Sequence, residues 1–169
     1  ERVKEHARGC PGIHFPAGSG AIGGMYRQFG TLVGASPDGR HCQASISATM
    51  SPFPGRDLQG PTAAVCSYTT LDHTLLPTGA PLDLSLDPKS VHGEQGLERL
   101  EAFVRGFLDL GGSVLTITVT DVDTLLKAQR EPEKYRGLRV RMGGWQAYFV
   151  ALNREHQDHH IARVKHCLR

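Results

Sequence analysis

The chain contains 169 residues, of which 39% are hydrophobic and 21% charged, with a formal net charge of +2 at pH 7. This composition excludes a disordered or collagen-like protein and suits one folded domain. No apolar run approaches the ~18 residues that a bilayer-spanning helix requires, so a membrane helix is excluded. The weak positive charge gives no reason to expect a nucleic-acid partner.

The N-terminal residues Glu1–Glu5 are charged, and no apolar signal core follows them. The sequence does not start with Met, so we expect a fragment or a processed piece. Its four cysteines, at positions 10, 42, 66 and 167, form no Cys-x-x-Cys pair. Such sparse usage favours a reducing cytoplasm over a disulfide-bonded secreted protein.

Residues 1–60 are rich in turn-forming residues, and no apolar periodicity persists from Gly9 to Gly60. We expect this third of the chain to be loop-rich. A loop of that length either lines a functional site or lies across a larger protein body. Within it, Met25–Val33 is expected to be a short helix or strand, and Ser36–Gly39 a turn built on Pro, Asp and Gly.

Regular elements are predicted mainly in residues 94–169. Apolar residues at helical spacing run from Leu97 to Leu108 and end at a Gly-Gly pair. The other expected elements are a helix or strand at Ala63–Tyr68, a strand at Val114–Thr120, a helix at Val122–Arg130 capped by Asp121, a strand at Leu138–Met142, and a helix from a cap at Asn153 to about Lys165. This order predicts an α/β fold with a right-handed crossover between parallel strands.

One glycine pattern resembles a ligand-binding motif. Gly18–Gly23 reads Gly-x-Gly-x-x-Gly, the spacing of dinucleotide-binding loops, which need a buried strand before them and a helix after them. Pro16 before the pattern and Gly24 after it suit neither element. A plain loop is therefore the preferred interpretation, with a nucleotide-binding module as the alternative.

A second pattern is a histidine cluster. His156, His159 and His160 are spaced i, i+3 and i+4, so they share one face of the last predicted helix. Zinc sites use such spacings, which makes a metal-binding module a further alternative. The polar and charged neighbours of the three histidines favour a solvent-facing helix end instead. We therefore expect no bound metal.

The most informative stretch is residues 139–152, which read Arg-Val-Arg-Met-Gly-Gly-Trp-Gln-Ala-Tyr-Phe-Val-Ala-Leu. The pattern predicts a strand that enters a Gly-Gly turn, followed by an aromatic-rich segment that packs beneath it. Considered alone, Gly144 indicates a tight bend with a positive φ angle. The sequence around the bend adds a second interpretation.

This stretch resembles the C-terminal region of the glycyl radical enzymes, the family of pyruvate formate-lyase and of the glycerol and choline lyases. The family signature Arg-Val-x-Gly-Tyr/Trp corresponds here to Arg141–Trp145, and the Phe-x-x-Leu after it to Phe149 and Leu152. The turn at Ser36–Arg40 resembles the family's Thr-Pro-Asp-Gly-Arg. Further family-like positions occur in the same order, at Gly60–Ala63, Ala128–Tyr135, Gln157 and Arg163.

The resemblance implies that Gly144 carries a stored radical on its α-carbon. Such a radical is stabilised between an amide nitrogen and a carbonyl when its centre is flat, and only glycine lacks a side chain that opposes flattening. Arg141, Met142, Gly143 and Trp145 would support the loop. The apolar segment after it would keep oxygen and water away. This glycyl radical is a post-translational modification, and no bound cofactor is implied.

The resemblance also implies partners. In this family a separate radical S-adenosylmethionine activase removes the glycine hydrogen, and the glycyl radical then generates a thiyl radical on a catalytic cysteine. None of the four cysteines here matches that position. The implied cysteine therefore lies on a barrel portion or subunit outside this chain.

The implied fold is the C-terminal part of a ten-stranded α/β barrel with a glycine radical loop. The implied activity is that of a lyase, decarboxylase or acyltransferase acting on a small organic substrate. The enzyme would be oxygen-sensitive and would work in an anaerobic cytoplasm.

The sequence departs from the family pattern in two places. Met142 stands where the family usually has Val, and Leu115–Val119 carries Thr where the family commonly has amide residues. The second difference argues against a close relative of pyruvate formate-lyase. Ser67-Tyr68 and Pro81–Leu84 look more like the arylacetate decarboxylase branch.

We therefore interpret residues 1–169 as a glycine radical domain, the C-terminal portion of a glycyl radical enzyme. The alternative within the family is a stand-alone radical-domain protein that repairs an oxygen-cleaved partner enzyme.

Overall fold

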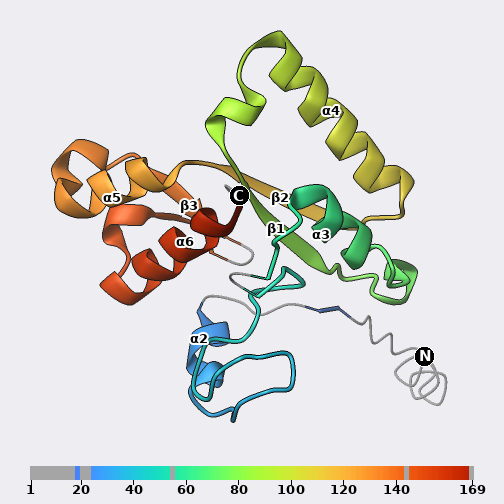
Figure 1. Ribbon diagram of the computed structural model, residues 1–169, viewed down its shortest axis with the longest axis horizontal. Coiled ribbons are helices and arrows are strands. Elements are labelled where there is room, and N and C mark those ends of the chain that lie inside the picture. The colour runs from blue at the N-terminus through green and yellow to red at the C-terminus, as the bar shows by residue number, and fades with distance from the viewer. Residues whose placement is uncertain (1–17, 20–23, 54–55, 143–144, 168–169) are drawn as a thin grey trace, which may run out of the picture.

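The computed structural model describes residues 18–19, 24–53, 56–142 and 145–167, with side chains described up to Arg163. Its helices are α2 (Met25–Gly30), α3 (Pro61–Tyr68), α4 (Gly93–Asp109), α5 (Val122–Arg130) and α6 (Arg154–Cys167). Its strands are β1 (Pro81–Leu86), β2 (Val114–Val119), β3 (Arg139–Arg141) and β4 (Gln146–Tyr148). Short 3-10 turns lie at His73–Leu75, Pro88–Val91, Pro132–Tyr135 and Phe149–Ala151. The elements form an α/β arrangement around two small sheets (Figure 1).

The central sheet is a parallel pair of β1 and β2, joined through α4. The strand expected at Val114–Thr120 is confirmed as β2, but its parallel partner differs from the expected one. It pairs with β1, a strand that the sequence analysis did not identify, whereas Leu138–Met142 contributes β3 to a separate antiparallel sheet. The 17-residue helix α4 provides the crossover that the parallel pair β1 and β2 requires, whereas the short connection from β3 to β4 permits only the antiparallel pairing that β3 adopts.

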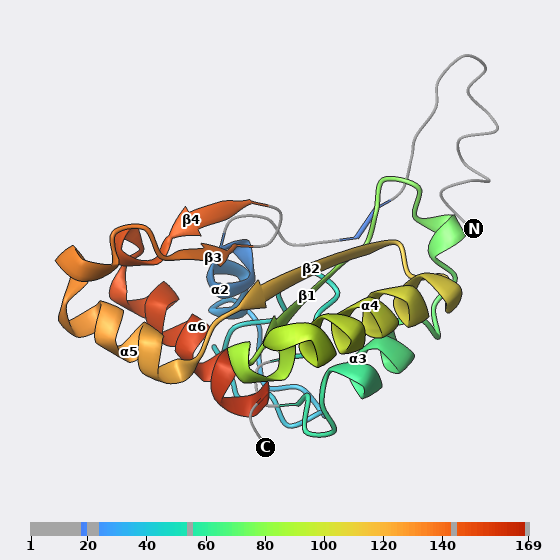
Figure 2. The same cartoon turned by 90° about the horizontal axis from the view of Figure 1, so that it is seen from above.

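The first core lies where α3 and α4 pack on the central sheet, and Figure 2 shows both helices on one side of the strands. Its buried members are Ala64, Val65, Tyr68, Ala80, Leu82, Leu84 and Phe107. The Tyr68 hydroxyl donates a hydrogen bond to the Ala80 carbonyl at 2.5 Å, so this buried phenol is satisfied. The segment expected as a helix or strand at Ala63–Tyr68 is thus a packed helix.

The second core joins α5, α6 and the β3–β4 hairpin. Its buried members are Leu125, Ala128, Val140, Phe149 and Ile161. Both expected helix caps are confirmed: Asp121 accepts a hydrogen bond from the Thr124 amide at 2.7 Å, and Asn153 accepts one from the His156 amide at 3.0 Å. These caps fix where α5 and α6 begin.

The turn expected at Ser36–Gly39 is also confirmed. The Gly39 amide donates to the Ser36 carbonyl at 3.0 Å, and Gly39 has a φ of 89°, which favours glycine. The next residue, Arg40, is buried, and its guanidinium donates to the carbonyls of Gly34 and, at 2.7 Å, Ala44. A buried arginine therefore holds a loop that contains no regular element.

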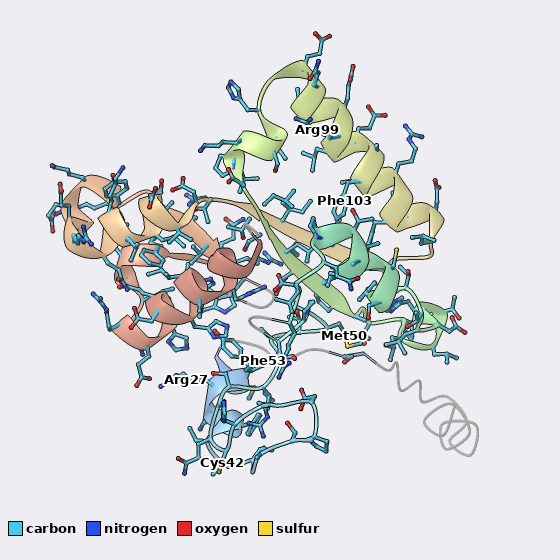
Figure 3. The ribbon with its side chains drawn as sticks, viewed as in Figure 1. Arg27, Cys42, Met50, Phe53, Arg99 and Phe103 are labelled. Carbon is cyan, nitrogen blue, oxygen red and sulfur yellow. The ribbon has the colours of Figure 1, made fainter. Side chains whose placement is uncertain are left out.

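Helix α2 packs against α6, far away in the sequence. Arg27 forms an ion pair with Glu155 at 2.8 Å, and the Tyr26 and His159 rings lie 4.7 Å apart between centroids. In Figure 3, Arg27 lies on α2 just below α6. The segment expected as a helix or strand at Met25–Val33 is thus a helix from Met25 to Gly30.

The Gly-x-Gly-x-x-Gly pattern lies mostly outside the described residues. Of Gly18–Gly23, only Gly18 and Ser19 are described, and the Ser19 amide donates to the Gly79 carbonyl at 3.0 Å. Among the helices that the structure describes, none is long and apolar enough to cross a bilayer.

The expectation that the α6 histidines face solvent is wrong. His160 is only 7% exposed, and His156 and His159 are partly buried against α2. Burial, aided by the positive charge of Arg163, lowers the pKa of both His159 and His160 to about 3. Polar neighbours in the sequence concealed this because polar residues also occupy the covered faces of the helix: Gln157 is itself buried, and Glu155 pairs with Arg27 of α2. Within the described ranges, no group of three His, Cys, Asp or Glu side chains could hold a metal ion.

Replacing a fully buried leucine should destabilise the central sheet. Leu82 is 0% exposed, so Leu82→Ala should lower the free energy of unfolding by about 2–5 kcal/mol. The matched control is Leu97→Ala on α4, where the side chain is 63% exposed and the change should stay within about 0.5 kcal/mol. Urea denaturation measures both, and equal losses would contradict this placement of the core.

Stability should fall in mild acid because of α6. The unfolded chain binds protons at His159 and His160 near pH 6.5, whereas the folded chain resists them down to about pH 3. The free energy of unfolding should therefore decrease below pH 6.5, by up to about 1.4 kcal/mol per pH unit for each histidine. Replacing both by Gln should flatten the profile between pH 6.5 and 4.5. Replacing the exposed His92 by Gln should leave the slope of the profile unchanged. If the variant with Gln at both 159 and 160 kept the wild-type slope, the burial of the His159 and His160 rings would be contradicted.

Candidate functional site

The candidate site is the end of the β3–β4 hairpin. The two strands pair antiparallel, with Arg139 opposite Tyr148 and Arg141 opposite Gln146. Val140 and Ala147 lie between them and are buried, so the alternation of polar and apolar residues sets which face of the hairpin meets the core. Figure 2 shows this hairpin lying across α5 and α6. The aromatic-rich segment therefore begins as a short strand before it turns into the core.

The hairpin closes at Met142 and Trp145. The Met142 amide donates to the Trp145 carbonyl at 2.8 Å. Gly143 and Gly144 connect these residues in the sequence and lie outside the described residues. The structure thus defines both flanks of the two-glycine segment, which the sequence analysis identified as the site.

The two flanks differ sharply in exposure. Met142 is 2% exposed, whereas Trp145 is 47% exposed. Arg141 is partly buried, and its Nε atom has no hydrogen-bond partner among the described residues. The supporting roles expected for Arg141 and Trp145 remain predictions. The role expected for Met142 is likewise a prediction, and the structure shows only that its side chain is packed in the interior.

Met142 contacts a residue that the sequence analysis did not assign to the site. Its Sδ atom lies 3.0 Å from Nε2 of His160 on α6, and both side chains are buried. Methionine sulfur is a weak hydrogen-bond acceptor, so an imidazole N–H suits it. The sequence does contain the His159-His160 pair, but the spacing of the histidines along α6 does not reveal which strand the helix packs against.

The segment after the hairpin is also held by α6. Phe149 is fully buried, and its amide donates to the Leu138 carbonyl at 2.8 Å. The Gln157 side-chain amide donates to the carbonyls of Phe149 and Leu152, at 3.1 Å each. Phe149, Leu152 and Gln157, which the sequence analysis matched to the family pattern, therefore form one contact group. Six residues further along the helix, Arg163 donates to the Asp83 carbonyl of β1 at 2.9 Å.

Neither of the two cysteines with described side chains adjoins the hairpin. Cys42 and Cys66 are exposed free thiols. Cys42 lies at the outer end of the loop after α2, remote from β3 and α6 (Figure 3). Cys66 belongs to α3, on the far side of the central sheet from α5. The described part of the chain thus places no thiol beside Met142 or Trp145.

Comparison with known proteins identifies this region. Residues 46–150 match the family model described as glycine radical. The chain is 37% identical over 137 residues to trans-4-hydroxy-L-proline dehydratase of Clostridioides difficile, covering 81% of this chain and 17% of that protein. It is 41% identical over 140 residues to isethionate sulfite-lyase of Desulfovibrio desulfuricans, covering 82% and 17% respectively.

Solved structures of glycyl radical enzymes are also similar to this chain. The glycerol-bound form of the B12-independent glycerol dehydratase from Clostridium butyricum is 36% identical, with a TM-score of 0.84, over 90% of this chain and 19% of that chain. A glycyl radical enzyme from Archaeoglobus fulgidus is 38% identical, with a TM-score of 0.82, over 89% and 19%. The chain thus spans less than a fifth of the length of these four relatives. It belongs to the glycyl radical enzyme family and represents the C-terminal, glycine radical region of that family.

Proposed function

We propose that this chain is the radical-storing part of a glycyl radical enzyme, with the unpaired electron on the α-carbon of Gly144. The observation that carries the proposal is the coincidence of the family match, which includes position 144, with the closed hairpin flanks at Met142 and Trp145. A buried anchor on one side of the two glycines and a half-exposed indole on the other suit a segment that must be held in place yet reached by an activating enzyme.

The chemistry requires two hydrogen-atom transfers. A radical S-adenosylmethionine activase removes one α-hydrogen from Gly144, which breaks a C–H bond and leaves one unpaired electron. The glycyl radical then takes a hydrogen atom from a cysteine thiol outside this chain, which restores Gly144 and leaves a thiyl radical. Glycine suits this role because its α-carbon can flatten without a side chain crowding the transfer. The protein's own contribution is position and exclusion of water.

The surfaces of the chain support a larger barrel around it. Parallel sheets are normally covered on both faces, yet β2 is only partly buried along its length and Val119 is 48% exposed. Among the described residues, no strand pairs with the outer edge of β2. An apolar cavity of about 480 Å³ between α3 and α4, lined by Val65, Leu100 and Phe103, is likewise partly open. We infer that further strands of a ten-stranded α/β barrel, including the catalytic cysteine, complete these surfaces.

The reaction proposed is lyase-type cleavage of a small organic substrate. Dehydratases, sulfite-lyases and decarboxylases all occur among the relatives. Identity to indoleacetate decarboxylase of Tractidigestivibacter scatoligenes is 33%, below the 37% to the hydroxyproline dehydratase and the 41% to the sulfite-lyase, so overall identity does not favour the arylacetate branch. Because a carbon-centred radical is destroyed by oxygen, the proposed enzyme would work without oxygen, and we propose that it does so in the cytoplasm.

Replacing Gly144 should abolish radical formation. Anaerobic incubation with the cognate activase should give the wild-type chain a carbon-centred doublet in electron paramagnetic resonance, and Gly144→Ala should give none. The control is Gly137→Ala: Gly137 is exposed, and a Cβ there would meet open space, so its doublet should match the wild type. A doublet that survives Gly144→Ala would refute the assignment.

Exposure to air should cut the activated chain at the same place. Oxygen adds to a carbon-centred radical, and the peroxyl product breaks the backbone at that residue. Mass spectrometry should find cleavage near Gly144 in the activated wild type and none in Gly144→Ala after the same treatment with the activase. An intact wild-type chain after a confirmed doublet would place the radical elsewhere.

A further inference from the structure

Helix α6 divides its three histidines between two partners. His156 and His159 face α2: the Tyr26 and His159 rings lie 4.7 Å apart between centroids, and a Cβ on Gly24 would lie 2.7 Å from Nε2 of His156. His160 faces the hairpin and contacts Met142 Sδ at 3.0 Å. The helix therefore contacts α2 with one pair of rings and the hairpin end with the third.

The Met142 contact has a direct route to the two-glycine segment. Met142 is the last residue before Gly143, and its amide closes the hairpin on the Trp145 carbonyl. The Met142 side chain is 2% exposed. Because protein interiors are close-packed, the residues that contact this side chain determine its position. The opposite flank is held separately, through the bonds from Gln157 to the carbonyls of Phe149 and Leu152.

His160 can keep this contact without charge. Its imidazole lies in a buried position beside His159, with His156 and the guanidinium of Arg163 also close enough to oppose a positive charge. A neutral imidazole has one N–H, and the tautomer with the proton on Nε2 donates it toward the sulfur. The bond is weak, but it is directional, and a purely apolar residue at position 160 would lose it.

We propose that His160 is a positioning residue of the glycine radical site, which acts by holding the Met142 side chain and so sets the point from which the two-glycine segment starts. This inference rests on the proposed role of Gly144. His160 touches neither the radical carbon nor substrate in this proposal. Its effect passes through Met142, and it is therefore measurable at Trp145 before any radical is formed.

The first test uses the unactivated chain. Trp145 is the only tryptophan, so its fluorescence reports on the hairpin end alone. His160→Leu should shift its emission to longer wavelength and raise acrylamide quenching; because Trp145 is already 47% exposed, full exposure allows at most about a two-fold rise. His160→Gln keeps an N–H donor and should restore wild-type quenching. Met142→Leu should act like His160→Leu, and the double variant should add nothing further.

The matched control is His159→Leu. That change removes the ring next to Tyr26 on the same helix but leaves Met142 untouched, so Trp145 quenching should remain at the wild-type value. Far-UV circular dichroism confirms that each variant keeps its helices. If His160→Leu does not fold, Met142→Leu against wild type decides the question. Unchanged Trp145 quenching in the folded His160→Leu variant, or in Met142→Leu where that comparison decides, would overturn the inference.

The second test separates this inference from the role of Gly144. After activation, His160→Leu should lower the yield of the doublet or alter its shape, and His160→Gln should recover both. If the wild type gives no doublet while Trp145 still responds to His160→Leu, the role of Gly144 fails and the contact with Met142 stands. If the wild-type doublet forms and His160→Leu leaves its yield and shape unchanged, the positioning role is refuted.

Discussion

The burial of helix α6 against the β3–β4 hairpin is the constraint on which the candidate site depends. Val140, Phe149 and Ile161 meet in one core, and Gln157 binds the two carbonyls that follow the hairpin. The same helix contacts α2 through His159 and β1 through Arg163. Three segments, the hairpin, α2 and β1, are thus fixed relative to one helix, and the hairpin that bounds the two-glycine segment packs on that helix.

This arrangement suits a site whose chemistry belongs to a backbone atom. A radical on a glycine α-carbon has no side chain through which the protein could orient it, so its position depends on its neighbours. Met142 is anchored in the interior, and Trp145 lies at the surface. One flank therefore provides rigidity, and the other provides a surface that a larger partner can cover. The partly exposed faces of β2 and the apolar cavity beside α4 support the proposal that further protein surface covers this chain.

The parts of the fold that the sequence predicted were those with local causes. The caps at Asp121 and Asn153, the Ser36–Gly39 turn and the helix around Phe107 each depend on residues within one or two turns. Strand β1 was missed because Pro81 and Asp83 interrupt its apolar pattern. Asp83 is nevertheless buried, because Thr49 and Thr116 donate hydrogen bonds to it. Its partners lie 33 and 34 residues away, and no local pattern contains that information.

The same distinction applies to the site. The motif around Gly144 was recognisable because its residues are contiguous, whereas the contact of His160 with Met142 spans 18 residues and appears only once α6 is placed. The central claim is that the unpaired electron resides on a glycine α-carbon. The most direct measurement is the electron paramagnetic resonance spectrum of activated chain grown with α-deuterated glycine. A glycyl radical has one remaining α-hydrogen, so deuteration should collapse the doublet to a single line, and a splitting that persists would contradict the account.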